Sequence, residues 1–430
     1  MTVSEIAKNA NSAALALAHL PTAVKNQALN EMASALQENC DFILSANKKD
    51  LNFAQEEGIA KPLVARLALN EDKVRGMAQG IRSVVALPDP AGVKQSVMEL
   101  DKDLTVHRVT CPIGVIGAIF ESRPDAVPQI ASLCLKSGNA VILKGGREAQ
   151  NSNKIIVGLL TEAIKKVAGV PEFAVQMIET RAEVADMLKE EKYINLIVPR
   201  GSNDFVKYIQ DNTKIPVLGH SEGICHNYID KEADLDKALR IALDSKLQYP
   251  AACNAMESLL IHKEIAAEIL PDLVKNFQEK GVTLLGCEKT CQIATDVSPA
   301  SEGEWDEEYN DLKLSIKIVD DLNEAIGFIN KHGSGHTDTI ITESSESAEQ
   351  FMNGVGSASV MWNASTRFAD GFRYGLGAEI GISTNKTHAR GPVGLEGLVI
   401  YQYRVFGNGQ IVSDYSGEKG RPFTHKQLSP

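Results

Sequence analysis

The chain has 430 residues, of which 43% are hydrophobic, 23% charged and 5% aromatic, and its formal net charge is −12 at pH 7. This composition is typical of a globular protein and excludes disordered, collagen-like and disulfide-scaffold chains. The acidic balance argues against nucleic acid and acidic membranes as partners, because both bind basic surfaces. The length exceeds what one hydrophobic core supports, so at least two cores are expected.

The N-terminus and the cysteines indicate where the protein works. The chain has no run of about 18 uninterrupted apolar residues, which a membrane-spanning helix would need. Residues 1–5 lack the basic and apolar regions of a signal peptide. The seven cysteines contain no CxxC pair and are odd in number. We therefore expect reduced thiols and a cytoplasmic protein.

The first half of the chain predicts helices followed by alternating strands and helices. Apolar spacing predicts helices at 4–19 and 23–37, and a Pro- and Gly-rich turn follows at 88–92. Beyond it we expect strands at 115–120, 140–143, 175–178 and 195–198, with helices at 126–136, 153–168, 181–189 and 204–210. This alternation is typical of βαβ units in a parallel sheet.

The second half repeats the pattern and then changes. We expect helices at 235–247, 263–280, 322–330 and 344–353, with strands at 258–261, 316–319 and 339–342. The tail has β-rich runs at 399–406 and 410–414 around Gly407-Asn-Gly409, a hairpin signal. The sequence therefore predicts two α/β domains and a small β element.

Phosphate-binding signals are weak in isolation. The chain has no GxGxxG, and Gly354-Val-Gly356 follows a helix and lacks the third glycine, so we interpret it as a turn. The strand-to-helix junctions at Leu143/Gly145 and Val198/Gly201 are better anion sites, because helix N-termini present free N–H groups.

The most informative run is 246–257. Cys253 lies between an amphipathic helix and a strand, and Gln248 and small residues precede it. A thiol on such a connection can face a cleft, where its thiolate is a strong nucleophile. Composition alone favours the alternative, a small buried hydrophobic residue.

This run resembles the catalytic-cysteine segment of the aldehyde dehydrogenase superfamily. Further landmarks of that family follow in order. They are Cys111-Pro-Ile-Gly-Val-Ile-Gly-Ala-Ile119, Leu143-Lys144-Gly-Gly-Arg-Glu148, Val198-Pro-Arg-Gly201-Ser202 and Glu307-Glu308-Tyr309. Longer strings resemble the branch of the superfamily that reduces glutamyl 5-phosphate. These include Phe120-Glu-Ser-Arg-Pro124, residues 131–146, Asn363-Ala-Ser-Thr-Arg-Phe368, Gly375-Leu-Gly-Ala-Glu379 and Thr387-His-Ala-Arg-Gly-Pro392.

The resemblance implies an aldehyde-dehydrogenase-like α/β fold of two Rossmann-like domains plus a small β oligomerisation arm. Residues 1–104 and 123–231 would form an NADP(H)-binding domain, and 232–379 a catalytic domain carrying Cys253. Residues 105–122 and 380–430 would form the arm and tail. Tyr401, Tyr403 and Val405 alternate as an interface strand would, so a homodimer or homotetramer is expected.

The implied reaction is NADPH-dependent reduction of L-glutamyl 5-phosphate to L-glutamate 5-semialdehyde and phosphate through a Cys253 thioester, the second step of proline biosynthesis from glutamate. A transient contact with glutamate 5-kinase would protect the labile acyl phosphate. One rival is an NAD(P)-dependent semialdehyde dehydrogenase acting in the oxidative direction, and another is a non-catalytic scaffold. Oxidising relatives carry a Glu that activates water, and His220 lies near its place here, which argues against the oxidative rival.

The resemblance also assigns site residues. Lys144, Gly146, Arg147, Gly201, Ser202 and Glu308 are expected at the cofactor. Arg147 stands where relatives place a ribose-binding Glu, so a second cation beside Lys144 favours NADPH; alternatively Arg147 faces solvent and Glu148 binds the ribose. Arg123, Asn363, Arg367 and Glu379 are expected at the substrate, with loop-stabilising ion pairs as the alternative. No metal site is expected, because Gly333 and Gly335 disfavour a helix that would bring His332 and His336 together.

Overall fold

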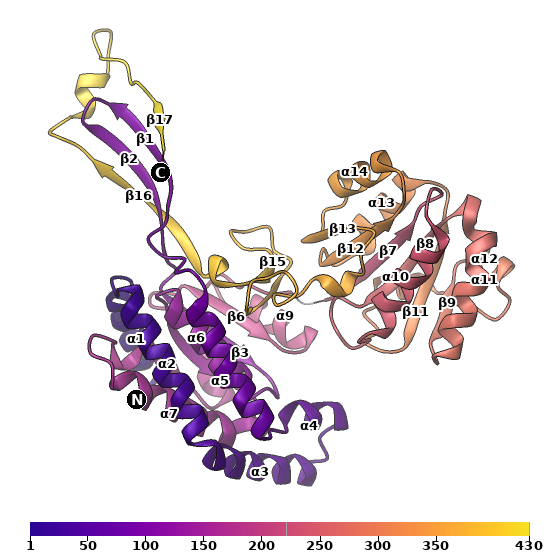
Figure 1. Cartoon of the computed structure of the whole chain (residues 1–430), viewed down its shortest axis with the longest axis horizontal. Coiled ribbons are helices and arrows are strands. Elements are labelled where there is room, and N and C mark those ends of the chain that lie inside the picture. Colours follow the sequence, from indigo (N-terminus) through magenta and orange to yellow (C-terminus); the bar gives the residue numbers. More distant parts are fainter. Residues whose placement is uncertain (221, 430) are drawn as a thin grey trace.

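The computed structural model describes residues 1–220 and 222–429, which form two α/β lobes and a β arm (Figure 1). In the first lobe the strands lie in the order β5-β4-β3-β6 and pair in parallel. The strands of this lobe are β3 (Val115–Phe120), β4 (Ala140–Lys144), β5 (Val175–Met177) and β6 (Leu196–Arg200). Every residue of β3 is buried, as expected for a central parallel strand covered on both faces.

Helices of the first lobe pack on this sheet around one large core. They are α1 (Val3–Leu17), α2 (Thr22–Glu38), α3 (Cys40–Glu56), α4 (Lys61–Leu67), α5 (Glu71–Ala86), α6 (Ala126–Lys136), α7 (Gln150–Lys165), α8 (Arg181–Met187) and α9 (Asn203–Asp211). The first of them begins with a capping box in which Thr2 and Glu5 satisfy each other's backbone N–H groups.

The second lobe is built on a larger parallel sheet in the order β10-β9-β11-β8-β7-β12-β13. Its strands are β7 (Cys225–Ile229), β8 (Met256–His262), β9 (Thr283–Gly286), β10 (Ser298–Pro299), β11 (Lys313–Val319), β12 (Thr337–Ile341) and β13 (Ser359–Trp362). Its helices are α10 (Leu235–Leu247), α11 (Lys263–Glu279), α12 (Glu288–Ile293), α13 (Leu322–His332) and α14 (Ser345–Gly354). In the described part of the chain no helix is long and apolar enough to span a membrane.

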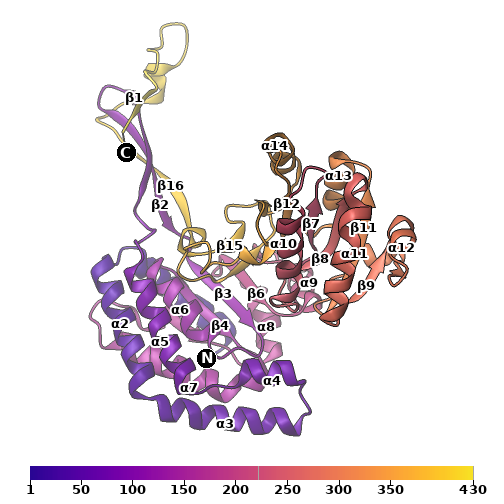
Figure 2. The same cartoon turned by 45° about the vertical axis from the view of Figure 1, so that its right-hand side comes forward.

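The arm is an antiparallel sheet that projects away from both lobes in two views (Figures 1 and 2). It contains β16 (Val399–Phe406), β2 (Leu104–Pro112), β1 (Lys94–Asp101) and β17 (Lys426–Leu428) in that order. The edge strand β16 exposes Tyr403 at 65% and Val405 at 61%. A long apolar edge strand of this kind is unfavourable in water unless another chain covers it.

Several expected boundaries need correction. The arm takes its hairpin from residues 94–112 rather than 105–122, because β3 pairs with β4 and β6 in the first lobe. Residues 380–398 also leave the arm: β14 (Gly381–Ser383) and β15 (Gly391–Val393) pair with each other, and neighbouring apolar residues join the first core. Strand β7 belongs to the second lobe, so the boundary near residue 231 falls too late.

The tail was also predicted wrongly in one respect. A hairpin was expected beyond Gly407, yet a 3-10 helix at Val412–Tyr415 follows the turn. The chain then returns as β17 on β1, at the other edge of the arm sheet. The local turn signal was correct, but the partner strand was set by a contact with a segment about 330 residues away.

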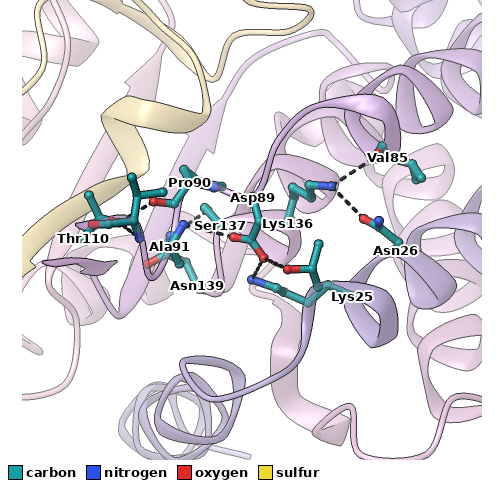
Figure 3. A network of polar contacts seen from close by, with 12 residues as sticks. Lys25, Asn26, Val85, Asp89, Pro90, Ala91, Thr110, Lys136, Ser137 and Asn139 are labelled. Carbon is teal, nitrogen blue, oxygen red and sulfur yellow. Dashed lines mark hydrogen bonds and ion pairs between the residues drawn. The ribbon is translucent and has the colours of Figure 1, made fainter. Parts of the chain in front are cut away.

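A polar network fastens the first helices to the base of the arm (Figure 3). Lys25 and Asp89 form an ion pair of 2.5 Å with side chains only 3% and 11% exposed. Asp89 also accepts from Thr22 Oγ1 at 2.7 Å and from the Ala91 N–H at 3.0 Å. Burial alone would raise the pKa of Asp89, but these hydrogen bonds hold the pKa below its ordinary value. Thr110 Oγ1 donates to the Pro90 carbonyl at 2.6 Å and ties in β2.

Replacing Asp89 with Asn should destabilise the protein by about 3 kcal/mol, because it leaves the Lys25 ammonium buried without an anion. Since the native pKa is depressed, this contribution is complete above about pH 5 and is lost as the pH falls through the native value. Urea unfolding of the wild type and Asp89→Asn at pH 7 and pH 3.5 measures both effects. The control is Asp72→Asn, whose partner Arg75 is exposed, and a loss as small as that control's would contradict the prediction.

Candidate active site

Cys253 lies half-buried in the loop between α10 and β8. A buried ion pair closes this loop at both ends: Lys246, near the end of α10, and Glu257, in β8, are 2.5 Å apart and no more than 1% exposed. Burial raises the pKa of Glu257 to about 7 and lowers that of Lys246. Within the loop, Asn254 Nδ2 donates to the Ala369 carbonyl at 2.8 Å. The nucleophile candidate is therefore held on a fixed backbone.

Two histidines from distant parts of the chain lie beside Cys253. One ring nitrogen each of His220 and His336 and the Cys253 Sγ lie within 4.8 Å of one another. The two imidazole rings meet edge to face with centroids 5.0 Å apart. His332, by contrast, bonds to Asp306 at 2.7 Å. The expectation of no metal site was based on the pair His332 and His336. The structure places only His336 near the nucleophile.

This trio of side chains is short of a closed metal site. Structural zinc sites take four protein ligands, and the described residues supply three here. A thiolate bound to a metal would also lose its freedom to attack a carbonyl. Catalytic zinc sites use three protein ligands, so the loss of the nucleophile, rather than the number of ligands, is the argument against a metal here.

A cavity of about 1050 Å³ lies between the first lobe and the Cys253 loop, with Tyr249 and Ala251 of that loop in its wall. Its cationic lining is made of Arg66, Lys73, Arg123 and Arg200. Its anionic lining is made of Asp125, Asp370 and Glu379. Both charge signs in one cavity suit a small zwitterion that carries additional negative charge.

Arg200, at the end of β6, is the cation that sequence reasoning missed. Its Nη1 atom is buried and has no hydrogen-bond partner in the described residues. Burial lowers the pKa of Arg200, Arg123 lowers it further, and Glu379 opposes the shift. Because its buried Nη1 has no hydrogen bond among the described residues, half-buried Arg200 can offer this atom to an anionic ligand. Arg200 is part of the run Val198-Pro-Arg-Gly-Ser, but only Gly201 and Ser202 of this run were assigned a role, as cofactor ligands.

The four residues predicted for the substrate separate into three groups. Arg123 and Glu379 line the cavity, and burial raises the pKa of Glu379, whose Oε2 accepts from the Gly371 N–H at 2.8 Å. Arg367 lies behind the Cys253 loop, where its Nε donates to Gln248 Oε1 at 2.9 Å. Asn363 does not line the cavity. Its side-chain amide instead bonds to the N–H and the carbonyl of Thr342, both at 2.9 Å. It is a loop-stabilising residue.

The predicted cofactor residues of the first lobe gather at the ends of β4 and β6. Burial lowers the pKa of Lys144, with Glu148 opposing the shift. Arg147 is exposed and its guanidinium lies over the Phe53 ring, 4.9 Å from the centroid. Glu148 Oε1 instead accepts from the N–H and hydroxyl of Ser122 at 2.6 and 2.7 Å. Ser122 therefore competes for the Glu148 carboxylate, whose alternative predicted role is to bind the ribose.

The N-terminus of α9 already binds an anionic group. The Ser202 N–H donates to Glu121 Oε2 at 3.1 Å, and a side chain at Gly201 would approach this oxygen to 2.7 Å. Asn203 Nδ2 donates to Glu308 Oε2 at 2.8 Å, so Glu308 of the second lobe lies against the start of α9. The structure thus brings Gly201, Ser202 and Glu308 to one place, at a helix N-terminus of the kind that binds phosphate.

Comparison with known proteins identifies the class. The family model described as the aldehyde dehydrogenase family matches residues 1–311. The chain therefore belongs to the aldehyde dehydrogenase family, and the expected fold class, an aldehyde-dehydrogenase-like α/β fold, is confirmed.

Individual members of the family are more informative. The chain is 54% identical over 429 residues to a γ-glutamyl phosphate reductase of Acetivibrio thermocellus, covering 100% of this chain and 99% of the relative. It is 55% identical over 428 residues to that of Methanococcoides burtonii, covering 97% and 95%. The crystal structure of γ-glutamyl phosphate reductase from Thermotoga maritima matches with a TM-score of 0.93 and 42% identity, covering 96% and 100%. Within its family the chain belongs with the γ-glutamyl phosphate reductases, which confirms the resemblance carried by the motifs.

Replacing Arg200 with Met should leave the free energy of unfolding unchanged or raise it by about 1 kcal/mol, because an unpaired charge leaves the cavity wall. Inorganic phosphate should raise the melting temperature of the wild type and have much less effect on this variant. Thermal unfolding with and without phosphate tests both points, with Arg240→Met, an exposed cation of α10 outside the cavity lining, as the matched control. Equal phosphate stabilisation of Arg200→Met and wild type would contradict the assignment.

Proposed function

We propose that this chain catalyses the NADPH-dependent reduction of L-glutamyl 5-phosphate to L-glutamate 5-semialdehyde and phosphate, the second step of proline biosynthesis from glutamate. The observation that carries the proposal is that Tyr249 and Ala251, which precede Cys253 in its loop, line a cavity that also holds cations and carboxylates. The names of the relatives of 54% and 55% identity support the same substrate. The activity is that of a glutamate-5-semialdehyde dehydrogenase working in the reductive direction.

Cys253 is the proposed nucleophile. Its thiolate attacks the acyl carbon of the substrate, the bond to the phosphate oxygen breaks, and a thioester remains on the enzyme. The backbone N–H of Cys253 is suited to stabilise the oxyanion that forms during this attack. When bound, NADPH would supply the hydride that reduces the thioester carbon to the aldehyde level. The C–S bond then breaks, and the aldehyde leaves Cys253.

The cavity charges suit the substrate. L-Glutamyl 5-phosphate carries a phosphate, a carboxylate and an ammonium group, and the cavity has four cations and three carboxylates for them. Guanidinium groups bind phosphate and carboxylate in forked geometry, which supports Arg200 and Arg123 as anion ligands. Glu379 is the proposed partner of the ammonium group. Arg367 would add a further positive charge from behind the Cys253 loop.

The first lobe fits a nicotinamide dinucleotide, the cofactor type of this family. The N–H groups at the start of α9 would bind the pyrophosphate in place of the Glu121 carboxylate, and Gly201 leaves the space that this approach needs. Lys144, Gly146 and Arg147 would line the adenosine side, and Glu308 the nicotinamide ribose. An exposed Arg147 beside Lys144 suits a 2′-phosphate, so NADPH is proposed over NADH.

The oxidative rival is less consistent with the relatives. The chains of 54% and 55% identity are both named γ-glutamyl phosphate reductase, which is a reductive activity. The exposed apolar edge of β16 supports a homodimer or homotetramer in which the partner covers Tyr401 and Tyr403. Catalysis by a free thiol supports a reducing compartment such as the cytoplasm, and contact with glutamate 5-kinase stays a proposal.

Replacing Cys253 with Ser should lower kcat by at least about 10³-fold, because a neutral hydroxyl is a far weaker nucleophile than a thiolate. The measurement is phosphate-dependent reduction of NADP⁺ with glutamate semialdehyde. The control is Cys287→Ser, which changes a thiol of the second lobe that lies outside the cavity. Phosphate-independent turnover by the wild type, or retained activity in Cys253→Ser, would refute the proposed reaction.

Replacing Arg147 with Glu should raise the KM for NADPH by at least about tenfold and leave the KM for NADH within about twofold, because the new carboxylate repels a 2′-phosphate. Initial rates with each cofactor measure the ratio. Lys154→Glu, an exposed charge reversal on α7, is the matched control. Equal changes for both cofactors would place Arg147 outside the adenosine site.

A further inference from the structure

His220 has a fixed orientation beside Cys253. Its Nδ1 lies 2.9 Å from the Ile382 carbonyl oxygen. Because a carbonyl oxygen can only accept, Nδ1 carries a hydrogen, and the lone pair of the neutral ring is on Nε2. A backbone contact therefore selects one tautomer, and the basic Nε2 has no hydrogen-bond partner among the residues that the structure describes.

His336, the second imidazole of the cluster, also has an unengaged ring nitrogen, because its buried Nε2 has no hydrogen-bond partner among the described residues. Its residue is 1% exposed, and its Nδ1 lies 2.8 Å from Thr337 Oγ1. Its ring meets His220 edge to face and limits how that ring can turn. His220, in contrast, is only half-buried. It is the more exposed imidazole of the pair.

We propose that His220 is the acid–base partner of Cys253, an inference that rests on the proposed function. The S–H bond of Cys253 breaks and its proton moves to His220 Nε2. The thiolate then forms the C–S bond, and the acyl C–O bond breaks with its electron pair on the departing phosphate oxygen. The Nε2 proton transfers to that oxygen, so hydrogen phosphate leaves and His220 is neutral again. The sequence consumes no oxidant and no additional proton.

The chemistry needs such a group at both steps. A free thiol is only a few per cent ionised at neutral pH, so a base raises the concentration of the nucleophile. Cleavage of the acyl phosphate without a proton would release the strongly basic trianion of phosphate, so an acid at the leaving oxygen lowers the barrier. One imidazole that first accepts and then returns the proton satisfies both needs.

Other charged groups around Cys253 are unsuited to this role. Arg200 and Arg367 lie close enough to Cys253 to interact with it electrostatically, but a guanidinium cannot take up a proton. Cys225 Sγ donates to the Cys253 carbonyl at 3.3 Å. The Glu308 carboxylate lies near Gly223, which packs on the Cys253 backbone, and it accepts from Asn203. Among these neighbours and the two histidines, His220 combines a fixed lone pair with partial exposure.

The test is His220→Asn, in which the amide nitrogen can keep the bond to Ile382 while the basic Nε2 is removed. The first readout is alkylation of Cys253 by iodoacetamide in the ligand-free protein, followed by peptide mass spectrometry. We expect the rate at pH 7 to fall at least about fivefold and the rates to converge at pH 10, where thiols ionise unaided. The second readout is kcat for phosphate-dependent NADP⁺ reduction, expected to fall about 10²–10⁴-fold with KM values within about twofold.

Controls separate this role from a structural one. His388→Asn removes an exposed imidazole that contacts only the Gly397 carbonyl in the hydrogen-bond network, and it should match the wild type in both readouts. If His220→Asn loses its circular dichroism spectrum or NADPH binding, His220→Gln takes its place. The proposal would be overturned if His220→Asn is alkylated at pH 7 at the wild-type rate and keeps its kcat within twofold of the wild type. It would also be overturned if alkylation is slowed in His336→Asn but not in His220→Asn. A wild type without phosphate-dependent activity would refute the proposed function, whereas the alkylation readout would still report on the His220–Cys253 pair.

Discussion

The buried ion pair between Lys246 and Glu257 is the contact on which the site depends most. It joins the last turn of α10 to the start of β8 and so fixes both ends of the loop that carries Cys253. The other oxygen of Glu257 accepts from the Asn310 N–H at 3.2 Å, and this segment carries Glu308. One carboxylate therefore positions the nucleophile loop and the proposed ribose ligand together. Two buried charges are costly to desolvate, so the pair contributes little net stability. Its effect is to define the geometry of the loop.

The distribution of charge explains how an acidic chain handles anionic ligands. The net charge of −12 would repel a phosphorylated substrate and a dinucleotide at a distance. The cations are concentrated where these ligands are proposed to bind, in the cavity wall with Arg200 and along β4 with Lys144. Local fields at close range outweigh a diffuse net charge, because salt screens the latter within about 10 Å.

Many elements of both lobes were predicted from local patterns, but α3, α5, β7, β9 and β13 lie outside the predicted ranges. The helix at 126–136 and the strand at 115–120 have the predicted limits, because buried strands and amphipathic helices carry their burial in the sequence. Strand assignment to sheets was less predictable. The strand at 115–120 joined the first lobe instead of the arm, and the tail paired with β1 instead of forming a hairpin. Backbone pairing between segments far apart leaves little trace in either segment, because its hydrogen bonds use the same groups in every residue.

The same division holds for the site. The sequence by itself determined the two α/β units, the family and the candidate nucleophile, because these depend on periodicity and on long motifs around Cys253. Only the tertiary structure decided that Asn363 braces a loop, that Arg200 faces a cavity without a partner, and that His220 and His336 meet at Cys253. Those facts depend on which side chains from distant segments share one space. That is settled by packing and by the pairing of buried polar groups, which act between segments and not along them.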